Sequence, residues 1–163
     1  NAQYIRESDP KDRAEALVPF LERLGFQSPD RSRVRGAAET LRMRSKTLVE
    51  MAESARFYFD DDFRYEEKAE RKFLKPDIAP LVKETRVRLE SLDGFTQKNL
   101  EGLFLRILDE KKIKLGEIAQ PLRVALTGTS VSPGLFEVME VLGKETVLRR
   151  MDKALQHIAQ KAP

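Results

Sequence analysis

Apolar side chains recur at spacings of three and four residues along most of this chain, which is typical of amphipathic α-helices. Near the N-terminus the apolar stripe consists of Ala14, Leu17, Val18, Leu21 and Leu24. Residues 96–108 follow the same spacing closely. No segment alternates apolar and polar residues for long, as a half-buried β-strand does. The pattern therefore predicts an all-α protein.

Capping and breaking residues divide the chain into about eight to ten expected helices, several of them short. Asp9 and Pro10 are typical of an N-cap and a first helical turn, and Gly25 of a helix end. Thr47 and Glu50 form a capping box, so we expect a helix from there to Phe59. Further helices are expected at about residues 31–42, 66–73, 77–89, 96–108, 132–142 and 144–158. Gly116 and Pro121 are expected to divide the segment between residues 108 and 132 into short pieces.

Gly94 interrupts the helical pattern, and the best candidate for a domain boundary lies near residues 91–95. We therefore expect two consecutive small helical subdomains, residues 1–92 and residues 93–163.

Composition indicates a globular protein outside the membrane. Of the 163 residues, 35% are charged and 40% are hydrophobic. No apolar run approaches the roughly 20 residues that span a bilayer, and the N-terminus has no signal-peptide pattern. Since the chain does not start with Met, we expect it to be a fragment of a longer protein.

The scarcity of reactive side chains excludes several kinds of site. The chain has no cysteine, which excludes disulfides and thiol nucleophiles and is compatible with a cytoplasmic location. His157 is the single histidine, and we expect it to be a surface or helix-end residue rather than a catalyst. No glycine-rich phosphate loop, nucleophile elbow or histidine-containing metal motif is present, so the chain alone is expected to be non-catalytic, without a metal or a cofactor.

Positive charge is concentrated in one segment, although the net charge is only +3. Residues 31–46 contain six cations and a single anion, Glu39. A basic segment of this kind suits RNA phosphates, but it is also compatible with a solvated helix surface that has no partner. The candidate phosphate-binding residues are Arg31, Arg33, Arg35, Arg42 and Lys46.

Two arginines stand at positions suited to base recognition. Arg44 lies just before the Thr47 cap, at a junction between helices, and Arg123 precedes the turn at Gly128. Unpaired RNA bases are read by side-chain donors and by stacking. From the residues alone, each arginine can equally be structural and pair with an acid.

Several blocks of sequence, in order, resemble the C-terminal anticodon-binding region of bacterial glutamyl-tRNA synthetases. The resemblance covers essentially the whole chain, and residues 1–6 resemble the junction that leaves the catalytic part. The blocks that carry it are residues 44–52, 56–59, 68–76, 115–128, 132–137 and 142–145.

This resemblance implies a cage-like α-helical region of a class I synthetase and a role for individual residues. Arg44 would read the third anticodon base, and Arg123 would contact the anticodon. Ser132, Pro133 and Leu135 would touch anticodon bases from the loop that enters the penultimate helix, with Ser132 standing where some members have threonine. Because members that charge both glutamate and glutamine tRNAs tend to lack arginine at the position of Arg44, its presence favours glutamate selectivity.

The resemblance also implies the chemistry of a longer protein. The full-length enzyme would ligate glutamate to tRNA with ATP and magnesium, through signatures in an upstream catalytic domain of the same chain. The fragment would bind the anticodon stem-loop of glutamate tRNA as a monomer. Two alternatives remain open, a helical protein–protein scaffold and a tRNA-binding appendage without anticodon selectivity.

Overall fold

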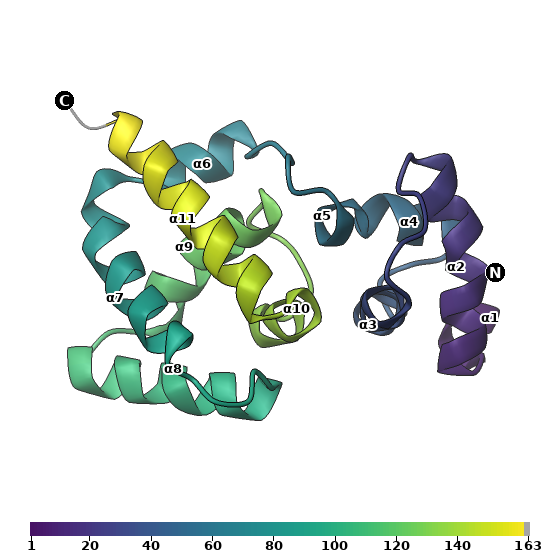
Figure 1. Ribbon diagram of the computed structural model, residues 1–163, viewed down its shortest axis with the longest axis horizontal. Coiled ribbons are helices and arrows are strands. Elements are labelled where there is room, and N and C mark those ends of the chain that lie inside the picture. The colour runs from purple at the N-terminus through teal and green to yellow at the C-terminus, as the bar shows by residue number, and fades with distance from the viewer. Residues whose placement is uncertain (162–163) are drawn as a thin grey trace. The chain divides into compact units, whose positions relative to one another are not determined.

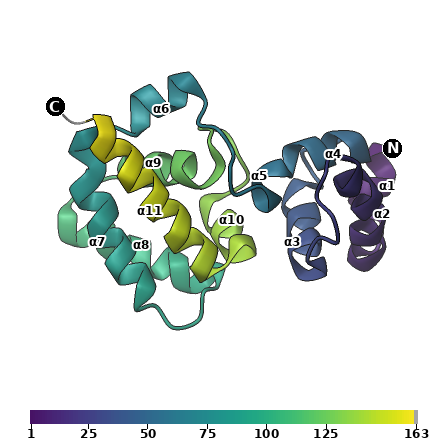
Figure 2. The ribbon, with the colours of Figure 1, turned by 45° about the horizontal axis from the view of Figure 1, so that its top comes forward.

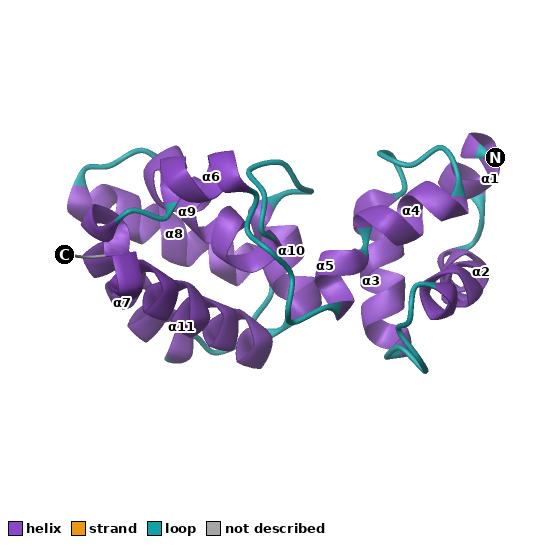
Figure 3. Ribbon diagram, turned by 90° about the horizontal axis from the view of Figure 1, so that it is seen from above, coloured by secondary structure: helices purple, strands orange, loops and turns teal. Residues whose placement is uncertain are grey.

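The computed structural model describes residues 1–161, which contain eleven α-helices, one short 3₁₀-helix and no β-strand (Figures 1 and 3). The predicted all-α fold is confirmed. The chain forms two compact units, one of residues Asn1–Asp62 and one that begins at Phe63. The expected boundary between residues 92 and 93 falls inside the second unit. The physical reason is that the helix Ala79–Glu90 packs against two later helices and shares their core.

The first unit is a small bundle in which α2 packs against α3 and α4 (Figure 2). Its core is formed by fully buried side chains that include Leu17, Leu21, Val34 and Met51. The apolar stripe near the N-terminus thus faces the core as predicted. The helices of this unit are α1 (Ala2–Glu7), α2 (Pro10–Arg23), α3 (Arg31–Leu41), α4 (Leu48–Ser54) and α5 (Arg56–Phe59).

Helix α1 was not among the predicted elements, and a buried arginine attaches it to the bundle. Arg13 on α2 is 2% exposed. Its Nη2 donates to the carbonyl of Ser8 at 2.6 Å, and its Nη1 pairs with Glu39 at 3.0 Å. It also donates to the carbonyl of Ile5 in α1. Its charge and its donors are therefore satisfied inside the fold, as burial requires.

In the second unit α11 packs along α7, α9 and α10, and α8 packs against α9 and α10 (Figures 1 and 2). Leu103, Phe104, Leu122, Val138 and Met151 are buried in its core. The helices of this unit are α6 (Glu67–Phe73), η1 (Pro76–Ile78), α7 (Ala79–Glu90), α8 (Gln97–Lys111), α9 (Leu115–Thr127), α10 (Leu135–Leu142) and α11 (Lys144–Lys161).

The predicted N-caps are mostly confirmed. Asp9 accepts from the N–H of Lys11, Thr47 from Glu50, and Thr96 from Asn99. The helix expected from residue 77 begins later, because Asp77 lies within the 3₁₀ turn η1 and α7 follows it without a side-chain cap.

The expected break at Pro121 was wrong, because α9 is continuous from Leu115 to Thr127. Proline has no N–H for the helical hydrogen bond and normally interrupts a helix. Here buried residues precede and follow the proline, Ile118 and Ala119 before it and Leu122 and Val124 after it, and we attribute the tolerance of Pro121 to this burial. Gly116 lies in the first turn, where the helix has no internal bond to lose.

The helix expected from Thr47 to Phe59 is divided at Ala55 into α4 and α5. Tyr58, in α5, lies in the core and is fully buried. Its hydroxyl is hydrogen-bonded to Thr40 Oγ1 at 2.8 Å. Burial of this aromatic ring with a satisfied hydroxyl therefore takes priority over local helix continuity.

Candidate nucleic-acid interface

The turn between α3 and α4 presents Arg44 on a well-anchored backbone. The N–H of Arg44 donates to the Leu41 carbonyl at 3.0 Å. Ser45 is buried, and its hydroxyl donates to the same carbonyl at 2.9 Å. The Arg44 side chain is exposed and makes no hydrogen bond or ion pair with any residue between 1 and 161. Its guanidinium donors are therefore available to a ligand.

Two apolar side chains close to this arginine in the sequence are exposed, a feature that the sequence pattern did not reveal. Met43 is 62% exposed and Val49 is 58% exposed. Nucleobases have apolar faces and polar edges, so an arginine beside exposed apolar side chains suits an unstacked base.

The candidate phosphate-binding residues fall into two groups. In the first group the guanidinium is already engaged within the protein. Arg31 pairs with Glu15 at 3.3 Å, and Arg42 pairs with Glu39 at 2.8 Å. Arg33 is half-buried and donates to the carbonyl of Tyr58 at 3.0 Å, which attaches α3 to the end of α5.

The second group consists of Arg35 and Lys46, which are exposed. Neither side chain forms an ion pair or a hydrogen bond in the part of the chain that the structure describes. The basic segment therefore offers a ligand fewer uncommitted cations than its composition indicates. Together with Arg44, these two residues carry the positive charge that is not neutralised locally.

In the second unit, Arg123 braces the loop between α9 and α10. Its Nε donates to Gln120 Oε1 at 3.1 Å, one turn earlier on the same helix. Its Nη1 donates to the carbonyl of Pro133 at 2.6 Å and to the hydroxyl of Ser132. The half-buried guanidinium thus holds both loop residues against α9.

Threonine hydroxyls hold the remainder of this loop. The Thr127 hydroxyl donates to the Arg123 carbonyl at 2.8 Å and accepts from the Thr129 N–H at 3.2 Å. The Thr129 hydroxyl donates to the carbonyl of Val131 at 2.7 Å. Val131 itself is 76% exposed. The result is a braced loop that presents an aliphatic side chain to solvent.

The structure thus brings Arg123, Ser132 and Pro133 together, as one contiguous site requires. Leu135 is only 5% exposed, in the first turn of α10, and belongs to the core beneath the loop. Helix α10 begins at Leu135 rather than at Ser132, which leaves Ser132 and Pro133 in the loop itself. The sequence showed the turn residues, but not that the arginine is bonded to them.

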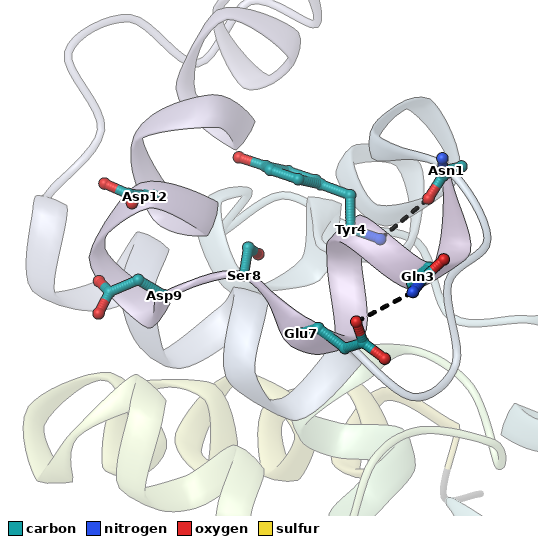
Figure 4. Close-up of a pocket in the computed structure, with 7 residues that line it drawn as sticks. All are labelled: Asn1, Gln3, Tyr4, Glu7, Ser8, Asp9 and Asp12. Carbon is teal, nitrogen blue, oxygen red and sulfur yellow. Dashed lines mark hydrogen bonds between the residues drawn. The ribbon is translucent and has the colours of Figure 1, made fainter.

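A hollow in the first unit is lined by acidic rather than basic side chains. Its lining includes Tyr4, Glu7, Asp9 and Asp12 (Figure 4). Three carboxylates disfavour a phosphate ligand. Between residues 1 and 161 there is no group of three or more histidine or acidic side chains that could hold a metal ion.

Comparison with known proteins identifies the family. A family model described as an anticodon binding domain matches residues 12–155. The chain belongs to this anticodon-binding domain family. The resemblance drawn from the sequence blocks is confirmed.

The most similar relatives include glutamate–tRNA ligases of bacteria. The chain is 46% identical to that of Geotalea uraniireducens over 97% of its own length and 34% of the relative. It is 45% identical to that of Syntrophobacter fumaroxidans over 99% of its length and 35% of the relative. The chain thus spans about a third of the length of these relatives. A solved glutamate tRNA ligase from Elizabethkingia meningosepticum shares its fold, with a TM-score of 0.87 and 23% identity over 97% of the chain and 31% of that structure.

Proposed function

We propose that this chain is the anticodon-binding part of a glutamate–tRNA ligase and that it recognises the anticodon of glutamate tRNA. The observation that carries the proposal is continuous similarity to such ligases over nearly the whole chain, at 45–46% identity. The exposed Arg44 and the braced loop between α9 and α10 supply the groups that anticodon reading needs.

Arg44 discriminates the third anticodon base, which is cytosine in glutamate tRNA and guanine in glutamine tRNA. An arginine side chain has donors only. Cytosine offers the O2 and N3 acceptors on its pairing edge, whereas the pairing edge of guanine offers two donors and one acceptor. Because the Arg44 guanidinium has no partner among residues 1–161, no hydrogen bond within the protein has to break before its donors bind a base.

The braced loop contacts the other anticodon bases. Ser132 supplies a hydroxyl, Pro133 supplies an apolar surface, and Arg123 sets the position of both. Leu135 contributes by fixing the first turn of α10 beneath the loop. Arg35 and Lys46 bind backbone phosphates, with Arg31, Arg33 and Arg42 adding to the local potential.

In the complete enzyme, a catalytic domain of the same chain binds ATP and magnesium and activates glutamate for transfer to tRNA in the cytoplasm. The present chain supplies binding energy and selectivity. Mixed with ATP, glutamate and tRNA, a preparation free of other synthetases should give no charged tRNA. Among residues 1–161, no helix has the length and apolar content needed to cross a membrane.

A gel-shift comparison tests the proposal. The chain should retard glutamate tRNA more strongly than an unrelated RNA of equal length. Equal retardation of both RNAs would indicate an appendage without anticodon selectivity. Absence of binding to either would favour a protein–protein scaffold.

A further inference from the structure

The loop of residues 63–66, which enters the second unit, is anchored by its aromatic residues. The ring of Phe63 lies 4.9 Å from the guanidinium carbon of the buried Arg150. Arg150 in turn donates to the Leu126 carbonyl in α9 at 2.7 Å. The ring of Tyr65 packs edge-on against His157 in α11, with 4.9 Å between the ring centroids. Both aromatic side chains therefore attach the loop to the core.

The backbone of this loop crosses the end of α9 in close contact. The N–H of Glu66 donates to the carbonyl of Gly128 at 2.7 Å. Gly128 has φ +84°, and a Cβ at this position would lie 2.5 Å from the Arg64 carbonyl oxygen. Only glycine permits both the left-handed conformation and this approach. Gly128 is also the first residue after α9, so the Arg64 backbone touches the start of the loop that Arg123 braces.

Between its two anchored neighbours, Arg64 is exposed. Within residues 1–161 its side chain forms no hydrogen bond and no ion pair, although Asp62 and Glu66 are close in the sequence. Two other arginines of this unit are engaged in ion pairs. Arg86 pairs with Asp152, and Arg88 with Glu110. An arginine without a partner on so constrained a backbone is preorganised to bind an anion.

We infer that Arg64 binds a backbone phosphate of the RNA whose bases meet the loop between α9 and α10. This inference rests on the proposed function and adds a contact that the sequence blocks do not include. A phosphate is the ligand favoured here because the guanidinium fork matches its oxygens in two-point geometry. Such a contact positions the RNA without reading its sequence.

The test compares the full chain with its Arg64→Gln variant in equilibrium binding to glutamate tRNA over a range of salt concentrations. The variant should bind several-fold more weakly. The magnitude of its slope of log affinity against log salt concentration should be smaller by about 0.7, the value expected for one single-strand phosphate contact. The loss should be equal for tRNAs with cytosine or guanine as third anticodon base. Arg64→Lys should recover part of the affinity, because the charge is kept.

The matched control is Arg106→Gln. Arg106 is exposed on α8, a helix that lies apart from α6 and the loop leading into it in Figure 1, and it forms no ion pair in the described range. Its replacement should leave both affinity and salt slope unchanged.

Identical binding by the Arg64 and Arg106 variants would overturn the inference while leaving the proposed function intact. A changed ratio between the two tRNAs would mean that Arg64 contacts a base, which overturns the phosphate assignment. If the parent chain fails to bind tRNA, the proposed function fails, and the inference fails with it.

Discussion

Arg123 donates to the backbone carbonyl of Pro133 across the loop that joins α9 to α10, at 2.6 Å. An arginine that the sequence predicts to face RNA thus has a second task, which is to fix the loop that presents Ser132 and Pro133. A bracing role of this kind accounts for why arginine, rather than any cation, stands at this position.

Replacement of Arg123 by lysine tests the bracing role. Lysine keeps the charge but has no fork with which to hold Gln120 and the two loop residues together. We expect amide hydrogen exchange in residues 129–134 to accelerate and tRNA affinity to fall, although net charge is unchanged. Ser132→Ala, which leaves the bond to Pro133 in place, should produce a smaller effect. Parent-like affinity and exchange in the lysine variant would show that Arg123 acts only through its charge.

The apolar stripe of α8 provides a stability test with a control on the same helix. Leu103 is 4% exposed, whereas Leu105 is 58% exposed. Leu103→Ala should lower the free energy of unfolding by about 2–5 kcal/mol, and Leu105→Ala by less than about 0.5 kcal/mol. Urea unfolding followed by circular dichroism measures both. A similar cost for the two variants would contradict the orientation of α8.

Within the basic segment, we expect the unpaired cations to contribute to RNA binding and the cations bonded within the protein to contribute to stability. Arg35→Gln and Lys46→Gln should each flatten the salt dependence of tRNA binding without lowering stability. Arg33→Gln should instead lower the unfolding temperature, since it removes the bond to the Tyr58 carbonyl. Binding titrations at several salt concentrations and thermal melts separate the two behaviours. A flattened salt slope and unchanged stability in the Arg33 variant would contradict this division.

An acid-dependent contribution to stability is expected from Glu70. Its carboxylate accepts hydrogen bonds from Lys161 and from His157. The bond from Lys161 is the main cause that lowers the pKa of Glu70, and burial partly opposes it. A lowered pKa means that the stabilisation is complete above the ordinary glutamate range and is lost as pH falls through the lowered value.

Glu70→Gln should therefore be less stable than the parent at pH 7, and the difference should shrink as pH falls below the ordinary glutamate range. Urea unfolding at several pH values gives the comparison. Glu101→Gln, at an exposed acid without an ion pair among residues 1–161, serves as the control and should show no such trend. A difference between parent and Glu70→Gln that persists unchanged at low pH would exclude the carboxylate as its source.

Local signals in the sequence predicted most of the helices because caps and apolar stripes act within a few residues. Thr47, Thr96 and the stripe that includes Leu103 are examples. Features that depend on distant partners were not accessible in this way. Pro121 is tolerated through burial, and α7 belongs to the second unit because of its packing on α11.

In the candidate site, too, local sequence signals were visible and contacts with distant residues were not. Arg44 was predicted from its place before a cap, and the structure shows only that its side chain is exposed. The internal bonds of Arg31, Arg33 and Arg42 were not foreseen, because they link residues far apart in the chain or depend on side-chain geometry. Arg64 carries no sequence signal, since its position depends on the crossing at Gly128.

The central claim is that the chain reads the anticodon, and Arg44 offers the most direct measurement. Two transcripts of glutamate tRNA, with cytosine or guanine as third anticodon base, are titrated against the parent chain and Arg44→Gln. We expect the parent to prefer cytosine by about 1–3 kcal/mol, by analogy with arginine–base contacts in DNA. Glutamine both donates and accepts, so Arg44→Gln should narrow this preference and leave binding to unrelated RNA nearly unchanged. Equal affinity of the parent for both transcripts, or a preference that Arg44→Gln does not alter, would contradict the account.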